Sequence, residues 1–159
     1  MKGRRSVKAE ELIKLCWLIS NAEAKNLGAR EIAPIHFLLG ALKIVDPKFP
    51  ERLDSLSISS EEWASMCRAA QAVRAYIDIL PNRVAEKRRN LRSRLNAKRN
   101  GPPITADGML HRSADLKRGF ADAIRFEEGD VLTLYDVIRS LFELELISLD
   151  DVDSKPSEP

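Results

Sequence analysis

The sequence predicts an all-α fold built from two tandem pseudo-symmetric helical repeats. Apolar residues recur at three-, four- and seven-residue steps along most of the chain. Long stretches contain neither Gly nor Pro, and aromatic residues make up only 6% of the 159 residues, which argues against a loop-rich β protein. The length suits a single domain, residues 1–159. No apolar run approaches the roughly 20 residues of a membrane span, so no membrane partner is expected.

Helix stop and start signals delimit the first two helices. Residues 8–26 carry apolar side chains on one helical face: Leu12, Leu15, Cys16, Ile19 and Ala22. Gly28 supplies a stop signal directly after this stretch. Pro34 suits the first turn of the next helix, because that turn needs no amide donor. This second helix is expected to end before Pro47.

A third helix and a strongly basic segment follow. Ser59 and Glu62 fit a capping box at the start of the third helix. Between residues 83 and 99, eight side chains are Lys or Arg and only Glu86 is acidic. The apolar seam in this segment is thin, which predicts a highly exposed basic helix or a helical linker. The sequence GPPITADG, residues 101–108, then breaks the helical pattern.

Two more helices are predicted after this break. An apolar stripe runs along the first of them up to Gly129: Leu116, Phe120, Ala123 and Ile124. Thr133 and Asp136 resemble the N-terminal cap of the second helix, whose stripe is Leu134, Val137, Ile138 and Leu141. The acidic, proline-containing end, residues 151–159, is predicted to be a disordered tail.

The two halves follow the same plan, which predicts an internal repeat. Gly28 is matched by Gly129, 101 residues later, as are the residues of the helix before it; beyond this glycine the offset falls to 100. Gly40 and Ser140 then occupy one equivalent point, where a close helix contact would exclude a large side chain. The predicted division is a first repeat at 7–80, a basic inter-repeat helix or linker at 81–108, and a second repeat at 109–150.

The stretch AEAKNLGAREIAPIHFLLGAL, residues 22–42, resembles the Clp N-terminal repeat found at the front of Clp-family ATPase unfoldases. Residues 34–42 fall on that family's pattern, roughly Thr-Glu-His-Leu-Leu-x-Ala-Leu-Leu. Residues 114–142, ADLKRGFADAIRFEEGDVLTLYDVIRSLF, are similar to the second repeat of the family domain. Together with the third helix, the resemblance extends over most of residues 7–147.

This resemblance implies a protein-interaction domain that docks polypeptide substrates or adaptor proteins for a Clp-type ATP-dependent unfoldase, present in cis or in trans. Binding would use an apolar groove between helices of the two repeats, with charged rims. The family's glutamate before the histidine is Ile35 here, its counterpart in the second repeat is Tyr135, and Asp136 stands in place of the second histidine. In some relatives that glutamate helps to bind phosphorylated arginine, and the resemblance does not extend to this activity.

His36 has a catalytic and a structural interpretation. A catalytic base needs a nucleophile beside it, and the sequence has no nucleophile elbow, so His36 is predicted to hydrogen-bond nearby backbone. Cys16, His36, Cys67 and His111 lack the close spacing of metal ligands, and no Walker motif occurs. We therefore predict no enzyme, no cofactor and no metal. Both cysteines lie in apolar helical patterns, which predicts reduced thiols in a cytoplasmic protein.

The basic segment provides the candidate partner-binding residues: Arg88, Arg89, Arg92, Arg94, Lys98 and Arg99. They could bind an acidic protein or nucleic acid. The alternative function is therefore a nucleic-acid-associated regulator that binds through residues 83–99. Its affinity for nucleic acid would fall as the salt concentration rises. The segment lacks the interleaved aromatic residues of a single-strand binder, and a solvated helix face is the third interpretation. Trp17 and Trp63 lie on or beside apolar stripes, as core or groove-lining side chains do.

Overall fold

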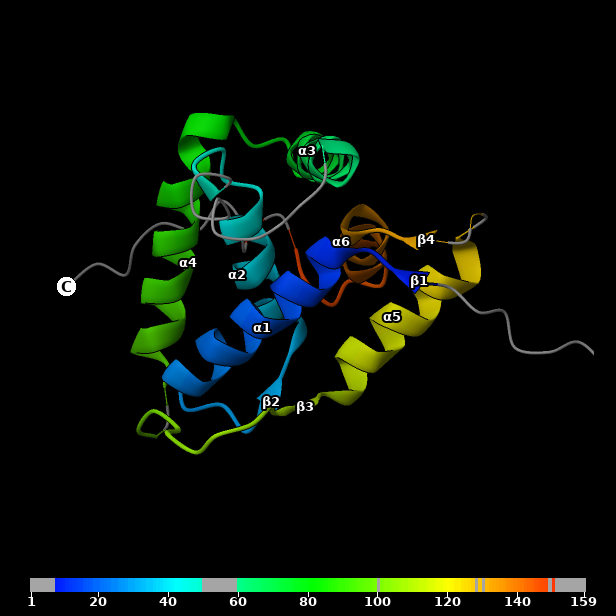
Figure 1. Ribbon diagram of the computed structural model, residues 1–159. Helices are drawn as coiled ribbons and strands as arrows, with labels where there is room; N and C mark the ends of the chain where they lie inside the picture. The colour runs from blue at the N-terminus through cyan, green and yellow to red at the C-terminus, as the bar shows by residue number, and fades with distance from the viewer. Residues whose placement is uncertain are drawn as a thin grey trace, which may run out of the picture.

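The computed structural model describes residues 8–49, 60–99, 101–127, 129, 131–148 and 150. This part of the chain contains six α-helices: α1 (Glu11–Asn26), α2 (Pro34–Ile44), α3 (Ser60–Tyr76), α4 (Val84–Ala97), α5 (Ala114–Phe126) and α6 (Leu134–Glu143). A short 3-10 helix, η2 (Pro81–Arg83), precedes α4. The helices pack together (Figure 1), and the prediction of an all-α fold is confirmed.

Most helix boundaries follow the signals in the sequence. α2 begins at Pro34, and Thr133 and Asp136 form the capping box of α6. Gly28 follows α1 with a φ of +72°, a conformation that glycine adopts without strain. α3 begins at Ser60, but the predicted pairing of Ser59 with Glu62 and the predicted tail at 151–159 lie outside the described residues.

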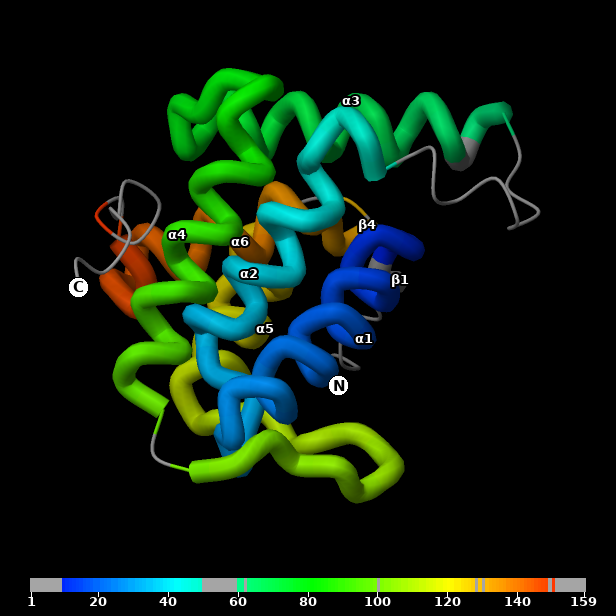
Figure 2. The backbone as a smooth tube through the Cα atoms, turned by 90° about the vertical axis from the view of Figure 1, so that its left-hand side faces the viewer, coloured from blue at the N-terminus to red at the C-terminus, as the bar shows by residue number. Residues whose placement is uncertain are grey.

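The second helix, α2, occupies the middle of the molecule. Phe37, Leu38 and Leu39 are fully buried, and α2 contacts α1, α4, α5 and α6. Figure 2 shows α1 and α4 lying beside α2, with α3 crossing above them. α1 and α2 share the most extensive helix contact. At this contact a Cβ on Gly40 would lie 2.5 Å from the Ser20 Oγ and 2.8 Å from the Cys16 carbonyl oxygen. Gly40 therefore permits a close approach that any larger residue would obstruct.

In the part of the chain that the structure describes, four two-residue strands join the two halves. β1 (Lys8–Ala9) pairs in parallel with β4 (Val131–Leu132), and β2 (Glu31–Ile32) pairs in parallel with β3 (His111–Arg112). Figure 1 shows the two pairs at opposite ends of α1 and α5. Such short strands have no periodicity that the sequence could show, and α1 begins three residues later than predicted because the chain first forms β1.

The order strand, helix, strand, helix occurs twice, as β1–α1–β2–α2 and as β3–α5–β4–α6, with α3, η2 and α4 between them. Exchanging β1 for β3 and β2 for β4 converts one strand pair into the other. The first helices begin 103 residues apart, at Glu11 and Ala114, whereas the residues matched between them in the sequence are 101 apart. The second helices begin 100 residues apart, which is the predicted offset for this part of the chain. The spacing falls from 103 to 100 because α1 has 16 residues and α5 has only 13. That the halves are pseudo-symmetric repeats stays a prediction.

The third helix is held to the second half of the chain by aromatic contacts. The Tyr76 ring meets the rings of Tyr135 and Phe142 edge to face, with centroids 5.7 Å apart in both pairs. These contacts attach the C-terminal end of α3 to α6.

Among the described residues, no helix combines the length and apolar character that a membrane crossing requires.

Candidate functional site

The basic segment forms a helix that is docked against the body of the protein. Val84 and Leu91 of α4 are fully buried, and α4 packs against α2. The thin apolar seam seen in the sequence is therefore sufficient to attach the helix. Residues 83–97 are not a free linker, and the expectation of a highly exposed helix is wrong for the side that faces α1 and α2.

Two of the predicted partner-binding residues are engaged within the molecule. Arg88 Nη2 donates to Glu23 Oε1 at 2.7 Å, and Arg92 Nε donates to Glu23 Oε2 at 3.0 Å. Glu23 belongs to α1 and its side chain is only 7% exposed. A buried carboxylate requires such partners, because an unpaired buried charge is strongly unfavourable. Arg88 and Arg92 thus attach α4 to α1, a role that the sequence analysis did not assign to them.

The remaining four predicted residues differ in exposure. Arg89, Lys98 and Arg99 are exposed, whereas Arg94 is half-buried. Arg99 Nη1 also donates to the carbonyl oxygen of Asn26, at 3.4 Å. The structure therefore does not collect the six residues into one binding site.

A hollow of about 830 Å³ lies between α1 and α4, and we call it the basic hollow. Leu18, Ile19 and Glu23 of α1 are part of its lining, which also includes four cationic side chains: Lys43, Arg88, Arg89 and Arg92. Glu23 is the one carboxylate among the described residues that line it. The hollow is therefore positively charged.

A second hollow, of about 480 Å³, lies between α1 and α5 and is mainly apolar. We call it the apolar hollow, and its lining is Ile13, Lys14, Trp17, Leu18, Met109, Arg112 and Phe120. The Arg112 guanidinium carbon lies 5.1 Å from the Trp17 ring centroid and 5.5 Å from that of Phe120. These two rings meet edge to face at 5.5 Å. Leu18 and Met109 are 58% and 43% exposed, which leaves a large apolar surface open to a partner.

Met109 belongs to the segment between α4 and β3, and contacts with α1 hold this segment at the apolar hollow. Lys25 Nζ donates to the carbonyl oxygens of Ala106 and Gly108, and Asn21 Oδ1 accepts the N–H of Leu110 at 2.8 Å. Lys25 and Asn21 belong to α1, so α1 holds the segment that contributes Met109. The sequence pattern marked Trp17 as core or groove-lining, which the structure confirms, but gave no signal for Met109 or Arg112.

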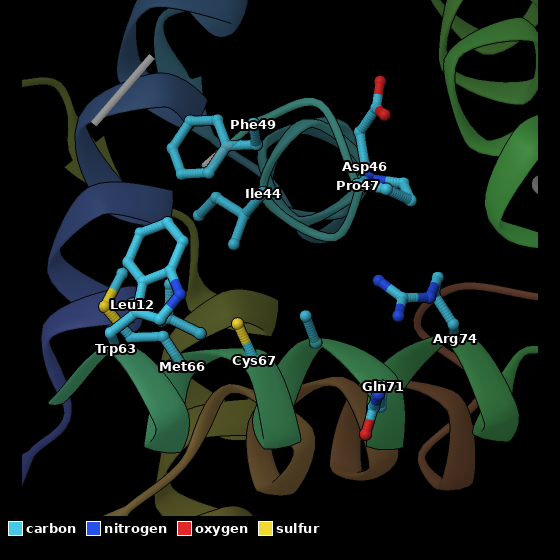
Figure 3. A pocket seen from close by; sticks show the side chains of 11 residues that line it. Leu12, Ile44, Asp46, Pro47, Phe49, Trp63, Met66, Cys67, Gln71 and Arg74 are labelled. Atoms are coloured by element: carbon cyan, nitrogen blue, oxygen red, sulfur yellow. The ribbon is translucent and has the colours of Figure 1, made fainter. Parts of the chain in front are cut away.

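A third cavity, of about 210 Å³, lies beneath α3 (Figure 3). Ile44 of α2 lies across this space from Met66 and Cys67 of α3, and Leu12 and Trp63 also line it. Arg74 lies at the other end and donates from Nη1 to the carbonyl oxygen of Val45 at 2.6 Å. The cavity is thus an apolar space between α3 and the α1–α2 pair, closed at one end by an arginine that is bound to backbone.

His36 makes the backbone hydrogen bond predicted for it. Its Nδ1 accepts the N–H of Ala33 at 2.9 Å, and the residue is 8% exposed. Burial lowers the pKa of His36 below its ordinary value of 6.5, although the nearby Glu23 carboxylate opposes this effect. His36 is therefore a neutral acceptor at the start of α2. The other histidine, His111, is exposed on β3.

The cysteines are free thiols in different surroundings. Cys16 is fully buried, its Sγ donates to the Phe37 carbonyl oxygen at 3.4 Å, and burial raises the pKa of its thiol. Cys67 is half-buried and lines the cavity beneath α3. Among the described residues, no group of three or more His, Cys, Asp or Glu side chains could hold a metal ion.

Comparison with known proteins gave no relative from which a function could be transferred. No protein-family model, no curated protein and no solved structure matches this chain. The resemblance to the Clp N-terminal repeat stays a prediction that rests on the residues quoted above.

Proposed function

We propose that this protein is a non-enzymatic, cytoplasmic interaction domain that docks polypeptide substrates or adaptor proteins for a Clp-type ATP-dependent unfoldase. The observation that carries the proposal is the apolar hollow between α1 and α5, which belong to different halves of the chain. Its Trp17 ring and the Arg112 guanidinium are of the kinds that supply most binding energy in protein interfaces. The resemblance to the Clp N-terminal repeat supplies the class of partner.

The exposed Leu18 side chain provides a direct test of docking. We would measure binding of fluorescein-labelled, reduced and carboxymethylated α-lactalbumin, a permanently unfolded polypeptide, by fluorescence anisotropy. Leu18→Ala is expected to weaken binding about tenfold, because an apolar anchor at an interface is worth about 1–2 kcal/mol. Leu80→Ala is the matched control, since Leu80 is also exposed, at 66%, but lines neither hollow. Equal binding by both variants would refute the docking site.

The unfoldase part of the proposal has a separate test. A Clp-type unfoldase with its peptidase would be assayed for degradation of the same labelled polypeptide, with and without this protein in trans. We expect the wild-type protein to change the degradation rate and the Leu18→Ala variant to change it less. Identical degradation rates in all cases would refute the unfoldase as the partner, while the docking of polypeptides would stand.

The alternative, a nucleic-acid-associated regulator, is supported by the exposed cations Arg89, Lys98 and Arg99 at one side and end of α4. Arg88 and Arg92 contribute less to it, because both are paired with the buried Glu23. This alternative predicts binding of duplex DNA or RNA that weakens steeply as salt rises. A gel-shift experiment at low salt with wild type and Arg89→Glu would decide it.

A further inference from the structure

The basic hollow and the apolar hollow meet at one residue. Leu18 belongs to the lining of both, and Figure 1 shows α1 lying between α4 and α5. On one side of Leu18, Trp17 of α1 and Phe120 of α5 line the apolar hollow. On the other side, Arg89 and Arg92 of α4 line the basic hollow. A polypeptide segment laid across α1 at Leu18 would therefore contact both surfaces at once.

The charges along this surface are nearly all of one sign. The two linings together hold six cationic side chains, Lys14 and Arg112 in one and Lys43, Arg88, Arg89 and Arg92 in the other. Their one carboxylate, Glu23, is buried beneath Arg88 and Arg92. Glu11, outside both linings, pairs with Lys14, but this pair is solvent-exposed and therefore weak. A partner that matches this surface carries negative charge.

We propose that the segment docked here is acidic and carries one large apolar side chain, an inference that rests on the docking function proposed above. The apolar side chain enters the apolar hollow beside Trp17 and Leu18, and its acidic neighbours lie against the exposed Arg89 of the basic hollow. Apolar burial supplies most of the affinity, and the charges select the partner and speed its association.

The geometry of the aromatic residues favours a peptide over nucleic acid at this surface. A base stacks on an open aromatic face, but the Arg112 guanidinium lies over the Trp17 and Phe120 rings. The Trp17 ring is further packed against Phe37, at 6.3 Å between centroids. An aliphatic side chain needs no ring face and can occupy the space beside Leu18 and Met109.

The test compares labelled ligands of equal length on the full chain by fluorescence anisotropy. The first is a peptide with one leucine flanked by aspartate and glutamate, and the others replace that leucine by serine, replace the acids by lysine, or are single-stranded oligo-dT. The acidic leucine peptide is expected to bind about tenfold more tightly than each of the others, as a few surface ion pairs or one apolar anchor would provide. Equal binding of the lysine or serine peptide, or tighter binding of oligo-dT, would overturn the inference.

Two variants with matched controls locate the contacts. Arg89→Glu is expected to weaken binding of the acidic peptide several-fold, and Leu18→Ala to weaken it about tenfold. The matched controls are Arg68→Glu, at an exposed arginine of α3, and Leu80→Ala, at an exposed leucine. Both controls should leave the binding unchanged. If Leu18→Ala weakens binding of unfolded α-lactalbumin but the peptide charge has no effect, the acidic partner is wrong and the docking function stands. If neither that polypeptide nor any peptide binds, the docking function itself fails.

Discussion

His36 and Asp136 accept the same hydrogen bond in two helices whose starts are one hundred residues apart. His36 Nδ1 accepts the N–H of Ala33, and Asp136 Oδ2 accepts the N–H of Thr133, both at 2.9 Å. Each acceptor lies three residues after its donor, in the first turn of α2 or α6. An imidazole and a carboxylate thus satisfy the equivalent backbone donor at the start of each helix.

We predict a pH dependence of stability that originates at His36. Because burial lowers the pKa of His36 below 6.5, the unfolded chain binds a proton at a higher pH than the folded chain does. The free energy of unfolding is therefore expected to fall as the pH drops from 6.5 to the lowered pKa, with no contribution from this group above that range. His36→Asn supplies an amide oxygen that accepts the same N–H without titrating. Urea unfolding across this pH range should show a smaller fall for His36→Asn than for wild type.

His111→Asn is the control for this measurement, since His111 is exposed on β3. This variant should keep the pH dependence of the wild-type protein. A stability difference between wild type and His36→Asn that is the same at neutral and mildly acidic pH would contradict the assignment to His36.

Removing the carboxylate of Glu23 should detach α4 from α1. Glu23→Gln leaves the guanidinium groups of Arg88 and Arg92 without their anionic partner, and we expect a loss of about 2 kcal/mol in the free energy of unfolding. The comparison is Glu86→Gln, which breaks a half-exposed ion pair with Arg83 and should cost less than about 0.5 kcal/mol. Urea midpoints measured on both variants test the difference, and equal losses would show that Glu23 has no special structural role.

The stability of a Gly40→Ala variant tests how closely α1 and α2 pack. Alanine gains about 1 kcal/mol of helix propensity over glycine, but overpacking typically costs about 1–3 kcal/mol. A Cβ at this position would lie 2.5 Å from the Ser20 Oγ and 2.8 Å from backbone, so Gly40→Ala is expected to destabilise the protein. Gly101→Ala meets no atom within 4 Å and should leave the melting temperature unchanged. A stabilised Gly40→Ala variant would indicate a looser helix contact than the structure has.

The two thiols should differ strongly in reactivity. Cys16 is fully buried with a raised pKa, and Cys67 is partly exposed at the cavity beneath α3. Treatment of the native protein with Ellman's reagent is expected to modify Cys67 and leave Cys16 intact, because the attacking species is an accessible thiolate. Mass spectrometry identifies the modified residue, and Cys67→Ser should abolish the native reaction. Rapid modification of Cys16 in the folded protein would contradict its burial.

The sequence predicted the helices well because each has an apolar face that repeats with the helical period. Pro34 and the pair Thr133 and Asp136 located the starts of α2 and α6 correctly. The strand pairs could not be foreseen, since two residues cannot show a period and their partners lie far away in the sequence. Matching Gly28 to Gly129 in the sequence did not reveal that α1 is three residues longer than α5.

The candidate site was predicted less completely than the fold. The sequence identified the basic segment and Trp17, but composition alone cannot show that a buried Glu23 engages Arg88 and Arg92. The apolar hollow combines residues of α1 and α5 with Met109, and only the folded chain brings these segments together. A surface formed by long-range packing has no local pattern by which it could be recognised.

Each strand pair contains one strand from each half of the chain, since β1 pairs with β4 and β2 pairs with β3. A molecule cut within 101–108 would therefore yield two fragments that complete one another, and not two independent domains. The same complementarity allows two intact molecules to swap their second halves once that segment leaves α1. Lys25 binds the segment, and Gly28 lets the backbone of residues 101 and 102 approach closely. These contacts therefore also oppose the exchange of halves between molecules.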